Sequence, residues 1–304
     1  MSVLNTGLVK AGAGAVWYGD RGVWAGGYDG KDTIDYISLA SAGDGSDFGN
    51  LTQGRSRFSG LAGGGRGVFC GGDRGGNVAR DEMDYVTIAS TGDATDFGDM
   101  TVARGSNASC SDGSRGVTSG GEVGANVGQD VNDYITIAST GDSSDFGDMS
   151  TLRWYHAGCG NATRGLFGGG YDGDISDVID YITIASTGDA TDFGDIDQGR
   201  HHPAACSSST RGVWGGGGND NKDVIQYVTI DTTGDAADFG DLRASGRAYL
   251  SGASSETRGF FGCGHTGGAV VKYVDQITFA STGDAVDWGD LTESRYMVAS
   301  FGGD

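Results

Sequence analysis

Aspartates that recur in sets of three are the residues of this sequence with the most evident capacity for chemistry. Within a set they stand three positions apart, as in the stretch GDATDFGD. Closely spaced carboxylates are ligands that Ca²⁺ prefers, although the spacing does not match the EF-hand loop. Aspartates at strand ends also accept backbone N–H groups in turns. The pattern therefore predicts structural turns without a metal, and it leaves calcium open as the alternative. The sets taken as examples of that alternative are Asp93, Asp96 and Asp99, and Asp189, Asp192 and Asp195.

The position of these sets also predicts a contact. The third aspartate of a set stands five or six residues before an arginine, as Asp148 does before Arg153 and Asp195 before Arg200. This spacing predicts a salt bridge at the start of each following unit.

The sets dominate the charge of the chain. The 304 residues carry 41 acids and 20 bases, for a net charge of −21, and 17 of the acids belong to the aspartate sets. Such a balance disfavours nucleic acid and anionic membranes as partners. No apolar run approaches the length of a membrane span, and the first 17 residues lack a secretory signal pattern. We therefore expect neither membrane insertion nor signal-directed export.

Other reactive side chains are sparse. The four histidines are not spaced as metal ligands, and the five cysteines contain no CxxC pair. The cysteines fall where other repeats have small or apolar residues, so we expect buried free thiols formed in a reducing compartment. Without a convergent set of catalytic groups, the sequence predicts no enzymatic activity and no cofactor.

The elements that position these residues are given by an internal repeat. The stretch DYVTIASTGDATDFGDM, which starts at Asp84, has six copies whose starts lie 46–49 residues apart. Upstream in each copy, two basic residues stand eleven positions apart, as do Arg153 and Arg164. With 60 glycines and one proline, the chain favours short strands and turns over helices.

Each copy predicts four strands. In the fourth copy these are residues 154–163, 164–170, 181–184 and 192–195, which alternate apolar and polar residues or end in glycine. Four-stranded units of this length are typical of propeller blades. The sequence thus predicts an all-β protein, a single six-bladed β-propeller of four-stranded kelch-like blades over residues 1–304. The predicted blades are 8–54, 55–103, 104–152, 153–199, 200–246 and 247–293, with an extra terminal strand in 294–304. Residues 10–17 and 295–301 compete for the innermost place of the first blade, and the sequence does not choose between them.

The blades resemble kelch repeats of the galactose oxidase-like propellers. The kelch pattern of arginine, glycine pair, tyrosine and tryptophan is similar to Arg153, Gly169 and Gly170, Tyr181 and Phe193. The sequence ITIASTGDATDFGD further resembles repeats in structural proteins of tailed bacteriophages. That resemblance implies a non-enzymatic virion protein, such as a tail fibre, baseplate or capsid-decorating module, assembled in the host cytoplasm. Its implied partners are other virion proteins and a host-surface glycan or receptor.

Binding residues are expected where the copies differ. The loops between the second and third strands vary from blade to blade, and variable loops on a rigid scaffold commonly carry recognition. The candidate residues in these loops are Tyr28, Arg74, Arg80, Tyr171, Asn219, Asn221 and His265. Two other functions remain open: a cellular kelch-like scaffold for protein interactions, and a glycan-active or oxidising propeller enzyme.

Overall fold

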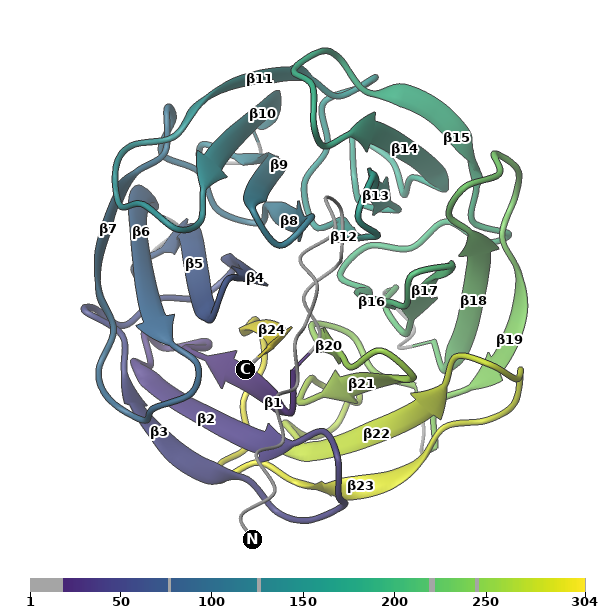
Figure 1. Cartoon of the computed structure of the whole chain (residues 1–304). Coiled ribbons are helices and arrows are strands. Elements are labelled where there is room, and N and C mark those ends of the chain that lie inside the picture. The colour runs from purple at the N-terminus through teal and green to yellow at the C-terminus, as the bar shows by residue number, and fades with distance from the viewer. Residues whose placement is uncertain (1–18, 76–77, 125–126, 219–221, 244–245, 304) are drawn as a thin grey trace, which may run out of the picture.

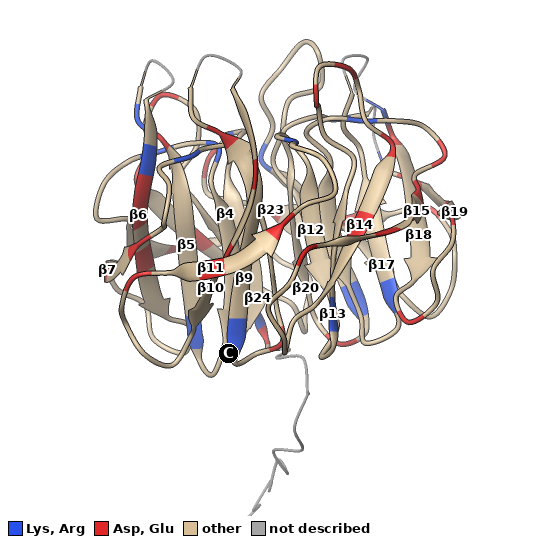
Figure 2. Ribbon diagram, turned by 90° about the horizontal axis from the view of Figure 1, so that it is seen from above, with Lys and Arg blue, Asp and Glu red and all other residues tan. Residues whose placement is uncertain are grey.

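The chain forms a six-bladed β-propeller (Figure 1), as the repeat predicts. The computed structural model describes residues 19–75, 78–124, 127–218, 222–243 and 246–303. Every blade is a sheet of four antiparallel strands, whose first strand lies nearest the axis and whose fourth lies at the outer rim. In the side view of Figure 2 the strands run between two faces, and we call the upper one, at which β6 begins, the upper face.

The strands of blades one to three have the following bounds, from axis to rim: β24 (Ala299–Gly303), β1 (Arg21–Ala25), β2 (Thr33–Ser38), β3 (Ser46–Asn50); β4 (Ser59–Gly63), β5 (Arg66–Asp73), β6 (Ala79–Thr87), β7 (Thr95–Asp99); β8 (Ala108–Ser111), β9 (Arg115–Glu122), β10 (Gly128–Thr136), β11 (Ser144–Asp148). Those of blades four to six are β12 (Ala157–Gly160), β13 (Arg164–Gly168), β14 (Val178–Thr183), β15 (Thr191–Asp195); β16 (Ala204–Ser207), β17 (Arg211–Gly215), β18 (Val224–Thr229), β19 (Ala237–Asp241); β20 (Ser251–Ser254), β21 (Arg258–Gly262), β22 (Tyr273–Thr278), β23 (Val286–Asp290).

The first blade is built from both ends of the described chain. β24 pairs antiparallel with β1, from Arg21 opposite Gly303 to Ala25 opposite Ala299. The C-terminal candidate therefore occupies the innermost place of this blade, and the competing stretch 10–17 lies outside the described residues. This pairing closes the ring, so no blade is left with an open face.

A buried arginine anchors the start of every blade. In the fourth blade, Arg153 is fully buried and pairs with Asp180 on β14 at 2.5 Å, not with Asp148 as the spacing predicted. The pairing register of β14 with β15 shifts beside Asp180, and such a bulge re-aims the neighbouring side chains. The same arginine–aspartate pair joins Arg55 to Asp84, Arg104 to Asp133, Arg247 to Asp275 and Arg295 to Asp35. In the fifth blade Arg200 meets Gln226 instead, so the predicted contact with Asp195 is wrong there too.

The second arginine of each unit links neighbouring blades. Arg66 lies over the ring of Tyr85 in its own blade, 4.7 Å from the ring centre, and donates to the carbonyl of Ala138 in the next blade. Blade six has Gln276 in place of the tyrosine, and there Arg258 lies over Trp288 at 5.0 Å. Trp288 thus compensates for the missing tyrosine by supplying the aromatic face for a cation–π contact.

The core is divided among the interfaces between blades. The five cysteines are free and buried, as expected, and burial raises the pKa of Cys70 to about 11. Cys110, on an inner strand, packs where a Cβ on Gly165 of the next blade would stand. Within the described residues, no helix is long and apolar enough to span a membrane.

Candidate functional site

The upper face carries a ring of residues around the axis, one from each blade. Each stands two positions after the buried arginine, in the segment that leads from the outer strand of one blade to the inner strand of the next. We call this set the axial ring: Arg57, Ser106, Tyr155, His202, Tyr249 and Met297. All six line one cavity of about 80 Å³.

The backbone of the axial ring is closed by six hydrogen bonds. Ser106 N–H donates to the carbonyl of Arg57, Tyr155 N–H to Ser106, and so on around the axis until Arg57 N–H donates to Met297, with N···O distances of 2.5–3.1 Å. Each blade thus donates once and accepts once. The position of every ring residue is therefore fixed by the backbone and does not depend on its side chain.

The axial ring also has an unusual backbone conformation. All six residues have φ between 56° and 61°, the left-handed region that glycine adopts without strain. A side chain there costs roughly 1–2 kcal/mol, and the chain uses glycine at many other left-handed positions. At the axial ring no blade has glycine. Strain retained in this way is characteristic of functional positions.

The side chains of the ring divide into two sectors. In blades four to six aromatic rings contact one another in series, with centroid distances of 3.8 Å from Tyr155 to His202 and 3.9 Å from His202 to Tyr249. Tyr249 then meets Tyr296, and Tyr296 stacks on Tyr28 at 5.0 Å. We call this continuous series the aromatic sector.

The polar sector lies over blades two and three. Arg57 pairs with Asp73 at 3.3 Å and with Glu122 at 3.7 Å, and the Ser106 hydroxyl donates to Glu122. Burial is the main cause that raises the pKa of Asp73, and burial with the neighbouring Glu122 raises the pKa of Tyr155. One guanidinium offsets only one of the two carboxylates, so this sector offers directed hydrogen bonds beside a small net negative charge.

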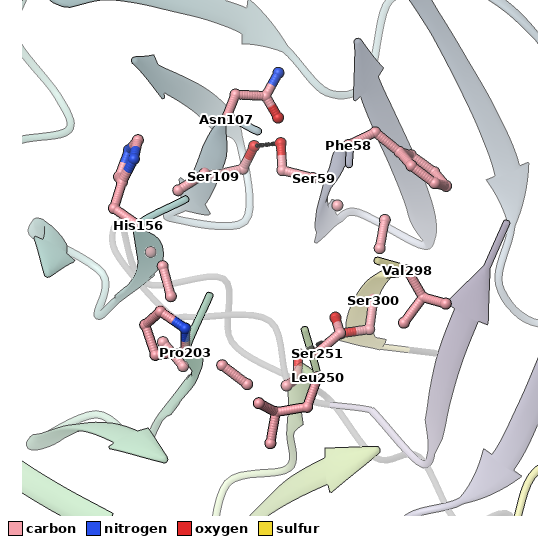
Figure 3. A pocket seen from close by; sticks show the side chains of 18 residues that line it. Phe58, Ser59, Asn107, Ser109, His156, Pro203, Leu250, Ser251, Val298 and Ser300 are labelled. Atoms are coloured by element: carbon pink, nitrogen blue, oxygen red, sulfur yellow. Dashed lines mark hydrogen bonds between the residues drawn. The ribbon is translucent and has the colours of Figure 1, made fainter. Parts of the chain in front are cut away.

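Below the axial ring the channel continues between the inner strands. Figure 3 shows this cavity of about 110 Å³, with the hydroxyls of Ser59 and Ser109 paired across neighbouring blades. Ser251 and Ser300 form a second such pair. His156 and Phe58 are equivalent residues of their blades, directly after the axial ring. Both are buried, and burial lowers the pKa of His156 to about 3.

Three of the residues predicted to bind lie close to the axial ring. Tyr28 and His265 both contact Tyr296, at 5.0 and 5.9 Å between ring centres. Tyr171 packs on Trp154, at 5.2 Å, at the far end of the aromatic series. Tyr28 and Tyr171 directly follow the glycine pairs of their blades, and His265 holds the matching position in blade six. The backbone N–H of each donates to the carbonyl of the residue just before an axial-ring residue.

The remaining candidates are placed differently. Arg74 forms a salt bridge of 2.8 Å with Glu82 of its own hairpin. Arg80 lies half-buried on β6. Asn219 and Asn221 lie outside the described residues.

The aspartate sets lie at the outer rim, away from the axial ring. The Asp142 carboxylate of blade three accepts the backbone N–H of Asp99 in blade two, at 3.1 Å. Two backbone bonds, from Gly141 to Phe97 and from Ser143 to Asp99, flank it. The equivalent aspartate makes this bond at the other five interfaces. Among the described residues, no group of three or more side chains is arranged to hold a metal ion.

Close approach of the backbones explains the glycines of the rim. Gly98 has φ of 140°, and a Cβ there would lie 2.5 Å from the carbonyl of Gly141 in the next blade. The turn of one blade thereby pairs with the outer strand of its neighbour and shields part of an otherwise open edge. The first aspartate of each set is thus a contact between blades.

Sequence reasoning missed the axial ring itself. Its signal was the position two residues after each buried arginine, where the residue type changes in almost every copy. Tyr28, Tyr171 and His265, in the variable loops between second and third strands, lie one step outward from the axial ring.

Comparison with known proteins does not assign the chain to a family. No protein-family model matches the chain, and no curated protein matches it significantly.

Proposed function

We propose that this propeller is a non-enzymatic recognition module that binds its ligand at the axial ring and the surrounding upper face. The observation that carries the proposal is the conflict between backbone and side chain at six equivalent positions. Each retains a side chain where glycine would relieve strain, and the side chains differ among blades. A scaffold role would repeat one residue, as the buried arginines do.

We further propose that the module is kelch-like and belongs to a tailed-phage virion, as a tail fibre, baseplate or capsid-decorating protein. The support for this is the resemblance of the repeat wording to repeats in phage structural proteins. The expected ligand is a host-surface glycan, because an aromatic sector beside directed hydrogen-bonding groups suits sugar rings. A net charge of −21 argues against an anionic polymer as ligand.

Binding and particle composition test the two parts of the proposal. A microarray of bacterial surface polysaccharides would be probed with the native protein and with Tyr155→Gly/Tyr249→Gly. Because glycine suits the left-handed backbone, the variant should stay folded, with a melting temperature within a few degrees of the native one, and lose at least tenfold in binding. The rim variant Asp145→Ala serves as the control that should bind normally.

Mass spectrometry of virions purified from the source of the sequence should detect the protein. Absence from particles would contradict the virion assignment, and unchanged binding by the glycine variant would contradict the site.

A further inference from the structure

A second cavity on the upper face lies beside the axial ring, between blades one and two. It has a volume of about 100 Å³, and we call it the Tyr28 cavity. Its rim is formed by exposed residues of the first blade's loop, chiefly Tyr28 and Asp29. Its floor contains Ser56 and Asp73, both at least nine-tenths buried, and the partly buried Arg57. The cavity therefore combines an accessible opening with a buried polar base.

The aromatic side of this cavity is preorganised. Tyr28 is 47 % exposed, yet its ring stacks on Tyr296 with an angle of 21° between the planes. Tyr296 is in turn held against Tyr249 and His265. The Tyr28 ring is thus supported without being covered, so a ligand that packs against it gains contact area with little loss of side-chain freedom.

The polar floor is held by contacts of blade two. Asp73 Oδ2 pairs with Arg57, and Asp73 Oδ1 lies against Gly105 of the next blade, where no ligand reaches it. Ser56 and Asp73 also bond to each other through their backbones. These contacts fix the floor beneath the exposed ring of Tyr28 and leave Ser56 and the partly buried Arg57 as its polar groups.

The mixture of charges selects the ligand class. Arg57 in the floor opposes a cationic ligand, and Asp29 with Asp73 opposes an anionic one. A neutral hydroxyl both donates and accepts, so it can bond to either kind of group. The C–H face of a sugar ring can lie on an aromatic ring such as Tyr28.

We propose that the Tyr28 cavity is a subsite for one neutral pyranose unit, with Tyr28 as platform and with Arg57 and Ser56 as the polar groups that bond to its hydroxyls. This inference rests on the proposed recognition function and assigns the ligand class and the blades that bind it. It places the sugar contact at the interface of blades one and two, beside the axis rather than on it.

The test uses three neutral probes: methyl α-glucopyranoside, methyl β-galactopyranoside and methyl N-acetyl-β-glucosaminide. Saturation-transfer NMR and titration on the full chain should show binding of at least one of them. Glucuronate and choline, the anionic and cationic comparators, should bind at least fivefold more weakly. Tyr28→Ala should weaken binding of the neutral probe at least fivefold, whereas Tyr28→Phe, which keeps the platform, should retain it.

Val286→Ala is the control, because Val286 is an exposed residue of the outer strand β23, away from the Tyr28 cavity, and its replacement should leave probe binding unchanged. Equal loss in both alanine variants, tighter binding of glucuronate or choline, or no binding of any neutral probe would overturn the subsite. If array binding still depends on Tyr155 and Tyr249 in that case, the proposed function stands without it. Tyr28-dependent probe binding without any dependence of the array on Tyr155 and Tyr249 would support the subsite and overturn the axial-ring proposal.

Discussion

The outer rim and the axial ring obey the same six-fold repeat and use it in opposite ways. At the rim, an aspartate side chain supplies one of the bonds from each blade to the next, as from Asp99 N–H to Asp142, and this aspartate is the same in all six copies. At the axis, the bond is made by backbone atoms alone, as from Tyr155 N–H to Ser106, and the residue type changes. Where a side chain carries the structural bond the sequence repeats, and where the backbone carries it the side chain is available for recognition.

The largest effect on stability should come from a substitution in one of the buried arginine–aspartate pairs that anchor the blades. Asp180→Ala leaves the fully buried Arg153 guanidinium without its carboxylate, and removal of one partner of a buried pair typically costs about 3–5 kcal/mol. Guanidinium titration should record a loss of this size in the free energy of unfolding. The double variant Arg153→Met/Asp180→Leu should recover most of it. A loss below 1 kcal/mol for Asp180→Ala would show that these pairs do not anchor the blades.

His156, which lies below the axial ring in blade four, should make the free energy of unfolding depend on pH. The folded-state pKa of His156 is lowered to about 3 from 6.5, so between these values the unfolded chain binds a proton that the folded chain does not. Stability therefore falls as pH falls through this window, by about 1.4 kcal/mol per pH unit.

His156→Phe, which copies Phe58 of blade two, should remove this term. Denaturant titrations at pH 6.5 and 4.5 should show that the native protein loses about 2–3 kcal/mol more than the variant. Rim carboxylates such as Asp99, with pKa values raised by burial and neighbouring acids, are common to both proteins and cancel in the difference. Parallel pH profiles would contradict a neutral buried histidine.

The buried pair of blade five, in which Gln226 replaces the aspartate, should gain stability from one substitution. Arg200 faces neutral Gln226, and burial lowers the pKa of Arg200 to about 10. Gln226→Asp restores the residue of the other blades and gives a charge-assisted bond, with an expected gain of about 1 kcal/mol. Thermal unfolding measures it. A destabilised variant would mean that blade five has repacked around glutamine.

Within the rim, the first and second aspartates of a set should differ. Asp142→Ala removes the acceptor for Asp99 N–H and should cost about 0.5–1 kcal/mol. Asp145, an exposed residue on β11, should cost less than 0.5 kcal/mol when replaced by alanine. Chemical denaturation of the two variants gives the comparison. Equal effects would assign the rim to bulk electrostatics rather than to specific bonds.

Metal removal should have the smallest effect. The bonds made by the first aspartates are to backbone donors, so EDTA should leave the melting temperature unchanged within error. A fall of tens of degrees that calcium reverses would instead make the rim a set of cation sites.

The repeat made the fold predictable, because the periodicity of Tyr-Ile-Thr-Ile and Asp-Phe-Gly-Asp directly reflects strands that alternate faces. Partners of buried charges were less accessible. Arg153 stands close to Asp148 in sequence, yet it bonds to Asp180, because the blade folds back and a shift in strand register brings Asp180 to the arginine. Distance along the chain carries no information about that register.

The site was only partly predictable for a different reason. Tyr28, Tyr171 and His265 were accessible because they lie in loops that visibly vary. Arg57 and His202 were not, because the property that sets them apart is a left-handed φ, which residue type signals through glycine, and here glycine is absent. The terminal strand of blade one was similarly undetermined, since both ends of the chain offered a suitable segment.

The closed circle of backbone hydrogen bonds has an evolutionary consequence. A substitution by any residue except proline, at any of its six positions, leaves every bond of the circle intact, so the positions can mutate independently without a compensating change elsewhere. Exchange of whole blades between related genes would likewise place a new residue in the axial ring without a change in the backbone hydrogen bonds that hold it. Such a molecule can diversify rapidly under selection from a changing target while its architecture remains constant.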